Sequence, residues 1–274
     1  MERSCFSEKT LILSVLTAEF ARCVLQTGAS VTARSLFLQG LPMALALVLI
    51  TALTAGAEQR ADSFLGTDLR SRIVCGGLGL WFVWEAVEAF RQAQELCWEN
   101  FSSMAMLGLL PLMLWAGWKL EPAVLVRCAP ILCWAAALTV LLCLLGLNGQ
   151  FHWEKLMLPT EPLTPTLPLY PEYFALPLFC PAKQVRCAVW LPVKVFILAG
   201  SFALCMKLVF GAGNALPGIE LLRAGRLGSI SQFDALVLLV WLAAAMFRFC
   251  VLVQVVRQLA GRLWGRATPA EENA

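Results

Sequence analysis

This sequence has few of the residues on which soluble enzymes and metalloproteins depend. Only 14% of its 274 residues are charged, and it contains one histidine, His152, and two tyrosines. A single histidine excludes most His-based metal and catalytic sites. There is no Gly-rich phosphate loop, no paired-aspartate metal motif and no Ser/His/Asp set, and Gly76, Gly77 and Gly79 in an apolar run indicate helix packing. We therefore expect a protein that is not an enzyme and needs no cofactor or metal.

The cysteines also lack the spacing of a disulfide framework or a metal site. Eleven of them are scattered at about one per apolar segment, and no two form a Cys-x-x-Cys pair. An odd number, dispersed through apolar runs, is typical of reduced and buried thiols. We predict that they pack as small hydrophobic side chains.

What the chain has in excess is apolar sequence. Hydrophobic residues make up 59% of it, its mean hydropathy is +0.74, and the apolar residues come in long blocks. This composition is typical of a multi-pass membrane protein. No polar linker longer than about 20 residues separates the blocks, so we predict one membrane domain over residues 1–260 and a short cytoplasmic tail over 261–274. Residues 1–9 are polar and lack a following cleavage motif, so we expect no signal peptide.

Windows of about 19 residues place eight candidate membrane spans in the chain. They lie at roughly 9–28, 36–55, 73–93, 102–118, 123–146, 166–181, 187–211 and 233–256. The sixth is short, and seven of the fourteen prolines fall between Pro159 and Pro181. Because proline removes a backbone donor and clashes with the preceding turn, we expect a broken helix there. Backbone freed at membrane depth must be buried in protein or line a cavity, which makes this segment the first candidate binding site.

Lys and Arg residues in the connections predict the orientation. With the N-terminus inside, twelve fall on the cytoplasmic side: Arg3, Lys9, Arg60, Arg70, Arg72, Lys119, Arg127, Lys183, Arg186, Arg257, Arg262 and Arg266. Five fall outside: Arg34, Arg91, Lys155, Arg223 and Arg226. This bias predicts that both termini are cytoplasmic. The net charge of +3 then reflects membrane topology, so we expect contacts with membrane lipids and none with nucleic acid.

Nine charged residues remain inside the predicted spans. They are Glu19, Arg22, Glu85, Glu88, Glu172, Lys194, Lys207, Asp234 and Arg248. A charge at the centre of a membrane helix costs about 2.5–3.5 kcal/mol on insertion scales, so such residues usually pair or face a polar pathway. We take all but the two lysines as candidate ligand-binding residues, together with Tyr170 and Tyr173, which flank Glu172.

The charged pairs on single helices also have a structural explanation. Glu19 and Arg22 are three residues apart and can neutralise each other, and Glu85 and Glu88 can share an inward face. The same holds elsewhere: the two tyrosines beside Glu172 can anchor that segment at the membrane interface. Both interpretations stay open at this level.

The seventh and eighth spans present similar alternatives. Lys194 and Lys207 lie within about two turns of their span ends, where long side chains can snorkel to the interface. Asp234 can cap its helix instead of binding a ligand. Arg248 lies about 21 Å into its span at 1.5 Å per residue, so snorkelling and an interior role both remain possible.

One stretch of the chain resembles a known family. From Asn214 the sequence reads NALPGIELLRAGRLGSISQFDALVLLVWLAAAMFR. It holds a Pro-x-x-Glu-Leu element, then Phe-Asp-Ala opening a helix, with a tryptophan one to two turns on; the matching residues are Pro217, Glu220, Leu221, Phe233, Asp234, Ala235 and Trp241. These features resemble the spore germination permeases, the B subunits of bacterial spore germinant receptors. The segments SFLGTDLRSRIVCGGLGLWFVWEAVEAFRQ and LPLYPEYFALPLFCP look like the third helix and the unwound sixth helix of that family.

The resemblance implies a fold. That family belongs to the amino acid, polyamine and organocation transporter superfamily, whose fold has two inverted repeats of five helices, with helices 1 and 6 broken around the substrate. The resemblance covers residues 7–257, most of the chain. It therefore implies an all-α, polytopic membrane bundle of about eight transmembrane helices, an incomplete 5+5 inverted repeat with a broken sixth helix.

The resemblance also implies a function. It indicates a permease-like subunit of the spore inner membrane that senses or transports a small polar ligand such as an amino acid, with a larger membrane subunit and a lipoprotein as partners. Backbone amides at the helix break would meet the ligand carboxylate, while Glu172, Glu19 or Glu85 would meet its amino group. Two other functions stay open: a non-transporting interaction subunit of a sporulation membrane complex, and a proton-coupled amino acid transporter in which Glu85 or Glu88 titrates.

Overall fold

The computed structural model describes residues 8–26, 33–55, 69–102, 104–147, 149–157, 189–211, 218–225 and 233–264. The longer helices are α1 (Glu8–Gln26), α3 (Leu41–Ala55), α5 (Leu69–Phe101), α6 (Ala105–Lys119), α7 (Pro122–Gly146), α10 (Leu191–Phe210) and α12 (Phe233–Leu263). The short elements are α2 (Ala33–Ser35), the π-helix η1 (Leu36–Gly40), the 3-10 helix η2 (Trp153–Met157) and α11 (Ile219–Ala224). Every regular element in the described ranges is helical, so the predicted all-α class is confirmed for them.

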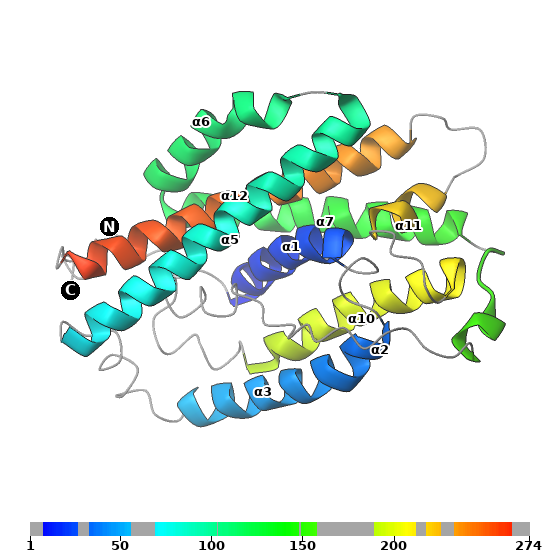
Figure 1. Ribbon diagram of the computed structural model, residues 1–274, viewed down its shortest axis with the longest axis horizontal. Coiled ribbons are helices and arrows are strands. Elements are labelled where there is room, and N and C mark those ends of the chain that lie inside the picture. The colour runs from blue at the N-terminus through cyan, green and yellow to red at the C-terminus, as the bar shows by residue number, and fades with distance from the viewer. Residues whose placement is uncertain are drawn as a thin grey trace.

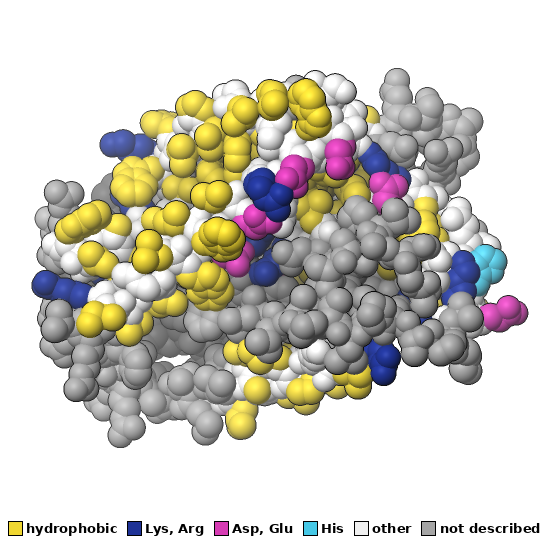
Figure 2. All heavy atoms as spheres, viewed as in Figure 1, with side chains coloured by type: hydrophobic (Ala, Val, Ile, Leu, Met, Phe, Trp, Pro, Cys, Tyr) yellow, Lys and Arg dark blue, Asp and Glu magenta, His cyan; other side chains and the backbone are white. Residues whose placement is uncertain are grey.

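Four of these helices are long and apolar enough to cross a membrane: α5, α7, α10 and α12. Much of their apolar surface faces outward. On α7 the exposed side chains Ile131, Trp134, Leu138 and Leu141 recur every three or four residues, and Figure 2 shows hydrophobic side chains covering α6 and the first half of α5. Water solvates such a surface poorly, whereas lipid solvates it well. The chain is therefore a helical membrane protein.

Helices occupy seven of the eight predicted windows, and the sixth window, 166–181, lies outside the described residues. Two helices are longer than predicted: α5 continues to Phe101 and α12 to Leu263. A hydropathy window stops at polar residues, whereas a helix continues through them where pairs three or four residues apart support it. Because only four described helices have the length and hydropathy of a span, the count of about eight stays a prediction.

The helix α12 occupies the centre of the bundle (Figure 1). It packs along α5 and also contacts α1, α6 and α7. The pairing with α5 is antiparallel: Gly76 lies beside Leu263, while the rings of Phe90 and Phe249 have centroids 5.8 Å apart. The helices α3 and α10 pack together and join the bundle through contacts of α10 with α1. The largest hydrophobic core cluster therefore lies along α12.

Glycines allow close approach of the short helix α11 to its neighbours. A Cβ atom at Gly218 would lie 2.9 Å from the carbonyl oxygen of Val24 on α1, and one at Gly225 would lie 2.5 Å from that of Cys143 on α7. The thiol of Cys143 also donates to the Leu222 carbonyl at 3.3 Å. These contacts tie α11 to the C-terminal ends of α1 and α7.

The predicted packing role of the three glycines on α5 holds for one of them. A Cβ atom at Gly76 would meet Leu263 at 3.3 Å, whereas Cβ atoms at Gly77 and Gly79 would find nothing within 4 Å among the described atoms. For Gly77 and Gly79 the packing role stays a prediction, because none of the described atoms lies close enough to either glycine to test it.

A single buried hydrogen bond links α12 to α1 and can be tested by substitution. The indole N–H of Trp241, 1% exposed, donates to the Ala21 carbonyl at 3.0 Å. We expect Trp241→Phe to lower the free energy of unfolding by about 0.5–1.5 kcal/mol, because the ring still packs but the bond is lost. The matched control is Trp134→Phe at an exposed site on α7, which leaves the unfolding midpoint in a detergent titration unchanged. Equal effects of the two variants would contradict the assignment.

Candidate functional site

A buried ion pair joins the middles of the two longest described helices. Glu85 is the central residue of α5, with sixteen residues on either side, and Arg248 is the central residue of α12, with fifteen on either side. The Arg248 NH2 and Glu85 Oε2 atoms are 3.3 Å apart, and the two side chains are 4% and 15% exposed. The residues are 163 positions apart in the sequence, so only the packing of α5 on α12 brings them together.

The position of Arg248 decides between its two sequence interpretations. At 1.5 Å per residue it lies about 23 Å from each end of α12, farther than its side chain can reach. Its guanidinium is buried and turned toward Glu85 rather than toward a helix end. Arg248 therefore has an interior role and does not snorkel.

The first helix contributes the most deeply buried carboxylate. Glu19 on α1 is 0% exposed, and Arg22, one turn farther on, is half-buried. Because α1 contacts α12 directly, Glu19 and Arg248 lie on two helices that pack together. The structure thus gathers Glu19, Arg22, Glu85 and Arg248 from three helices into the interior of one bundle, although they come from distant parts of the sequence.

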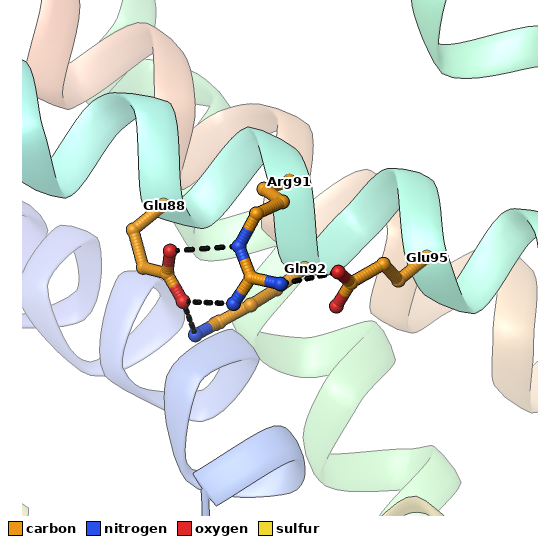
Figure 3. A network of polar contacts seen from close by, with 4 residues as sticks. All are labelled: Glu88, Arg91, Gln92 and Glu95. Atoms are coloured by element: carbon orange, nitrogen blue, oxygen red, sulfur yellow. Dashed lines mark hydrogen bonds and ion pairs between the residues drawn. The ribbon is translucent and has the colours of Figure 1, made fainter.

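Glu88 lies one turn after Glu85 but belongs to a different network (Figure 3). The Arg91 guanidinium donates to both of its carboxylate oxygens, at 2.9 and 2.6 Å, and the Gln92 amide donates to one of them at 2.8 Å. Arg91 also pairs with Glu95. Figure 3 shows that all four of these side chains come from α5. Glu85 therefore forms the ion pair with Arg248 across the helix interface, whereas Glu88, 30% exposed, is bonded along α5 itself.

These residues form a line of polar groups along α5. We call Glu85, Glu88, Arg91, Gln92 and Glu95 the α5 polar ladder. Side-chain exposure rises along it from 15% at Glu85 to 30% at Glu88 and 55% at both Arg91 and Glu95. The hydrogen-bonded part of the ladder therefore extends from the exposed C-terminal half of α5 to Glu88, one turn from the buried ion pair.

The remaining predicted site residues lie outside the described structure or at its edge. Tyr170, Glu172 and Tyr173 fall outside the described residues. Asp234 is in the first turn of α12, but its side chain is not described, so capping and ligand binding both stay open.

The two lysines that the sequence assigns to snorkelling lie near opposite ends of α10. Lys194 is exposed close to its start, and Lys207 is half-buried in its last turn. Both positions are close enough to a helix end for a long side chain to reach the interface. Neither lysine takes part in the buried ion pair.

One buried polar residue was missed by the sequence prediction. Gln254 on α12 is 2% exposed, and its Oε1 atom has no hydrogen-bond partner among the described residues. Because Gln254 carries no charge, a count of charged residues within the predicted spans does not include it. The available signal was that Gln254 is the only amide in the predicted eighth span, and an amide at that depth needs a partner as a charge does.

The described residues contain no group of three His, Cys, Asp or Glu side chains placed to hold a metal ion. Their eight cysteines are free thiols, and five of these are buried: Cys23, Cys75, Cys97, Cys143 and Cys250. These five pack as the sequence predicts. The chemistry available in the described bundle is therefore that of ion pairs and hydrogen bonds.

Comparisons with known proteins identify no relative. No protein-family model, no curated protein and no solved structure gives a significant match to this chain.

Proposed function

We propose that this chain is an integral membrane, permease-like subunit that senses or transports a small zwitterion such as an amino acid. The Glu85–Arg248 pair, buried between the midpoints of α5 and α12, carries this proposal. A buried pair adds little net stability, because the cost of desolvating both charges offsets their attraction. Ionisable groups at membrane depth are therefore first considered as parts of a ligand or ion pathway.

The chemistry of the pair fits a zwitterion. The Arg248 guanidinium can bind a carboxylate through two parallel hydrogen bonds, and the Glu85 carboxylate can accept from an ammonium group. One contact of 3.3 Å joins the two side chains, so a zwitterion entering between them exchanges one ion pair for two. The total charge of the site does not change. An anion or cation of similar size would instead leave a net charge buried at high cost.

The surroundings of the pair supply a second carboxylate and a route. Glu19, buried on the neighbouring helix α1, is proposed to contribute to binding the ligand's ammonium group, and the α5 polar ladder leads inward from the exposed end of α5. The helices α1, α5 and α12 occupy predicted spans 1, 3 and 8. In the fold implied by the resemblance to spore germination permeases, these spans surround the substrate, and the contacts of α12 with α1 and α5 support that placement.

The proposal extends to the complete membrane domain. On this view about eight spans belong to a 5+5 inverted-repeat fold, and the proline-broken sixth segment completes the site with Glu172. The chain works in the spore inner membrane, with both termini cytoplasmic and with other germinant-receptor-type subunits as partners. Ligand binding favours one of two conformations of the bundle, and the partners respond to that change.

Thermal unfolding of the purified chain in detergent, with each of the twenty L-amino acids added, tests ligand binding. A ligand at 100 times its Kd stabilises the folded state by about 2.7 kcal/mol, so we expect at least one amino acid to raise the apparent Tm by several degrees. The matched controls are analogues that lack one charged group, such as propionate and ethylamine for L-alanine. We expect neither analogue to shift the Tm.

The outcomes separate the candidate functions. Equal shifts with an amino acid and its analogues would contradict zwitterion recognition. No shift with any amino acid would contradict ligand binding and favour the non-transporting interaction subunit. Where a shift is found, uptake of that amino acid into proteoliposomes with and without a pH gradient distinguishes a proton-coupled transporter from a sensor.

A further inference from the structure

The described charges divide unequally between the two ends of the helix bundle. One end comprises the starts of α1, α5, α7 and α10 and the C-terminal ends of α6 and α12. Arg257 near the end of α12 donates to the Leu120 carbonyl just after α6, at 3.5 Å, and Leu263 of α12 lies beside Gly76 near the start of α5. The first turns of α1, α7 and α10 share one hydrophobic cluster.

We call this end of the bundle the basic end. Its described charged side chains are seven cations, Lys9, Arg72, Lys119, Arg127, Lys194, Arg257 and Arg262, and one acid, Glu121. The opposite end mixes the two signs, with Arg34, Arg91, Lys155, Lys207 and Arg223 against Glu95, Glu99, Glu154 and Glu220. In Figure 2 the acidic side chains lie over the middle and right of the view, and only Lys and Arg side chains are visible among the charged groups at the left.

Three exposed tryptophans lie at the same end, and one of them, Trp190, directly precedes α10 and is 62% exposed. Trp118, in the last turn of α6, is 46% exposed, and Trp264, directly after α12, is 72% exposed. Tryptophan side chains at helix ends prefer the level of the lipid headgroups. The basic end therefore meets a membrane surface.

Cationic and apolar groups meet in one place at this end, the exposed face of the last two turns of α6. Arg257 uses one N–H on the Leu120 carbonyl, and its guanidinium carries further donors. Lys119, which directly precedes Leu120 in the chain, is exposed. One to two turns back along α6, the exposed side chains of Leu114 and Trp115 form an apolar surface.

We propose that the C-terminal end of α6, with Arg257 beside it, binds one anionic phospholipid. The phosphate of the headgroup pairs with Lys119 and the free N–H groups of Arg257, Trp118 lies at the glycerol level, and the acyl chains lie on Leu114 and Trp115. A soluble anion or an acidic peptide has no acyl chain to cover this apolar surface, which favours a lipid. Glu121 is also exposed here and reduces the net positive charge, so the site holds one headgroup rather than a cluster of anions.

The proposal places the basic end at the leaflet that is rich in anionic lipid, which is the cytoplasmic one. It does not depend on ligand binding at the Glu85–Arg248 pair. The two sites lie far apart along α12, because Arg257 is nine residues beyond Arg248, about 13 Å along the helix axis.

Lipid retention tests the proposal. The chain, purified in detergent, is incubated with equal amounts of phosphatidylglycerol and phosphatidylcholine and washed, and the bound lipids are counted by native mass spectrometry. We expect wild type to retain phosphatidylglycerol preferentially. A cation near an anionic headgroup is worth about fivefold in binding, so Lys119→Gln with Arg257→Gln reduces that preference at least about tenfold. Lys119→Gln alone, an exposed change, reduces it about fivefold.

The control removes two cations from the opposite end, Arg34→Gln with Arg223→Gln, and retains the wild-type preference. Equal retention of the two lipids by wild type would overturn the proposal, and so would an equal loss in the control. An excess of inorganic phosphate that displaces the bound lipid would also overturn it, because it would show a simple phosphate site without acyl-chain contacts.

Discussion

Glu85→Ala lowers the free energy of unfolding by about 3–5 kcal/mol, because it removes the carboxylate that forms an ion pair with the buried guanidinium of Arg248. Titration of the protein in mild detergent with dodecyl sulfate, followed by circular dichroism, measures the effect. The matched control is Glu95→Ala on the same helix, in an exposed pair with Arg91, which leaves the unfolding midpoint unchanged.

The companion variant replaces both partners of the pair. Glu85→Leu with Arg248→Met returns the stability to within about 1 kcal/mol of wild type or above it, because apolar side chains of similar volume avoid the desolvation of two charges. A Glu85→Ala protein as stable as wild type would show that Glu85 is not the main partner of the buried Arg248 guanidinium. A double variant as unstable as the single one would show that the site requires polar groups for folding.

The second large effect is expected at Gly117, where α6 lies directly against α12. A Cβ atom there would be 2.8 Å from the Cβ of Val253 and 3.0 Å from the carbonyl oxygen of Cys250. Gly117→Val therefore forces the two helices apart and lowers the free energy of unfolding by about 1–3 kcal/mol or more. The same dodecyl sulfate titration measures this loss.

Gly108, on the same helix, provides the control for this substitution. A Cβ atom at Gly108 would have nothing within 4 Å, so Gly108→Val leaves the midpoint unchanged. Equal midpoints for the two variants would mean that α6 does not pack on α12 as closely as described. A loss confined to Gly117→Val would locate the contact between the two helices.

Hydropathy predicts the helices of this chain well and their ends poorly. The segments Leu69–Phe101 and Phe233–Leu263 both extend beyond their predicted windows. The polar residues that close the window in α5 are bonded to one another along the same helix face, so they do not interrupt the helix. The sequence shows this pairing as Glu88, Arg91 and Glu95 at spacings of three and four. The orientation count, however, assigns Arg91 to a connection between spans, so the pairing is not used to extend the predicted helix.

The candidate site shows a similar limit. A charge tally selects Glu19, Glu85 and Arg248 from the sequence because charges are rare in apolar segments. It cannot pair Glu85 with Arg248, because the choice between Glu85 and Glu88 depends on the rotation of α5 against α12. The distance of Arg248 from the end of its helix could not be predicted either, because α12 ends at Leu263, seven residues after the predicted end of the eighth span. Tertiary packing decides both points.

The proposed function is tested most directly by ligand-induced stabilisation in a protein that folds without the buried charges. The amino acid that gives the largest Tm shift in wild type is compared in wild type and in the Glu85→Leu, Arg248→Met double variant. Glu99→Ala, at an exposed position of α5 outside the polar ladder, is a control that keeps the pair. We predict a shift of several degrees in wild type and in Glu99→Ala and none in the double variant. An equal shift in the double variant would contradict the account, because the ligand would then bind without the Glu85–Arg248 pair.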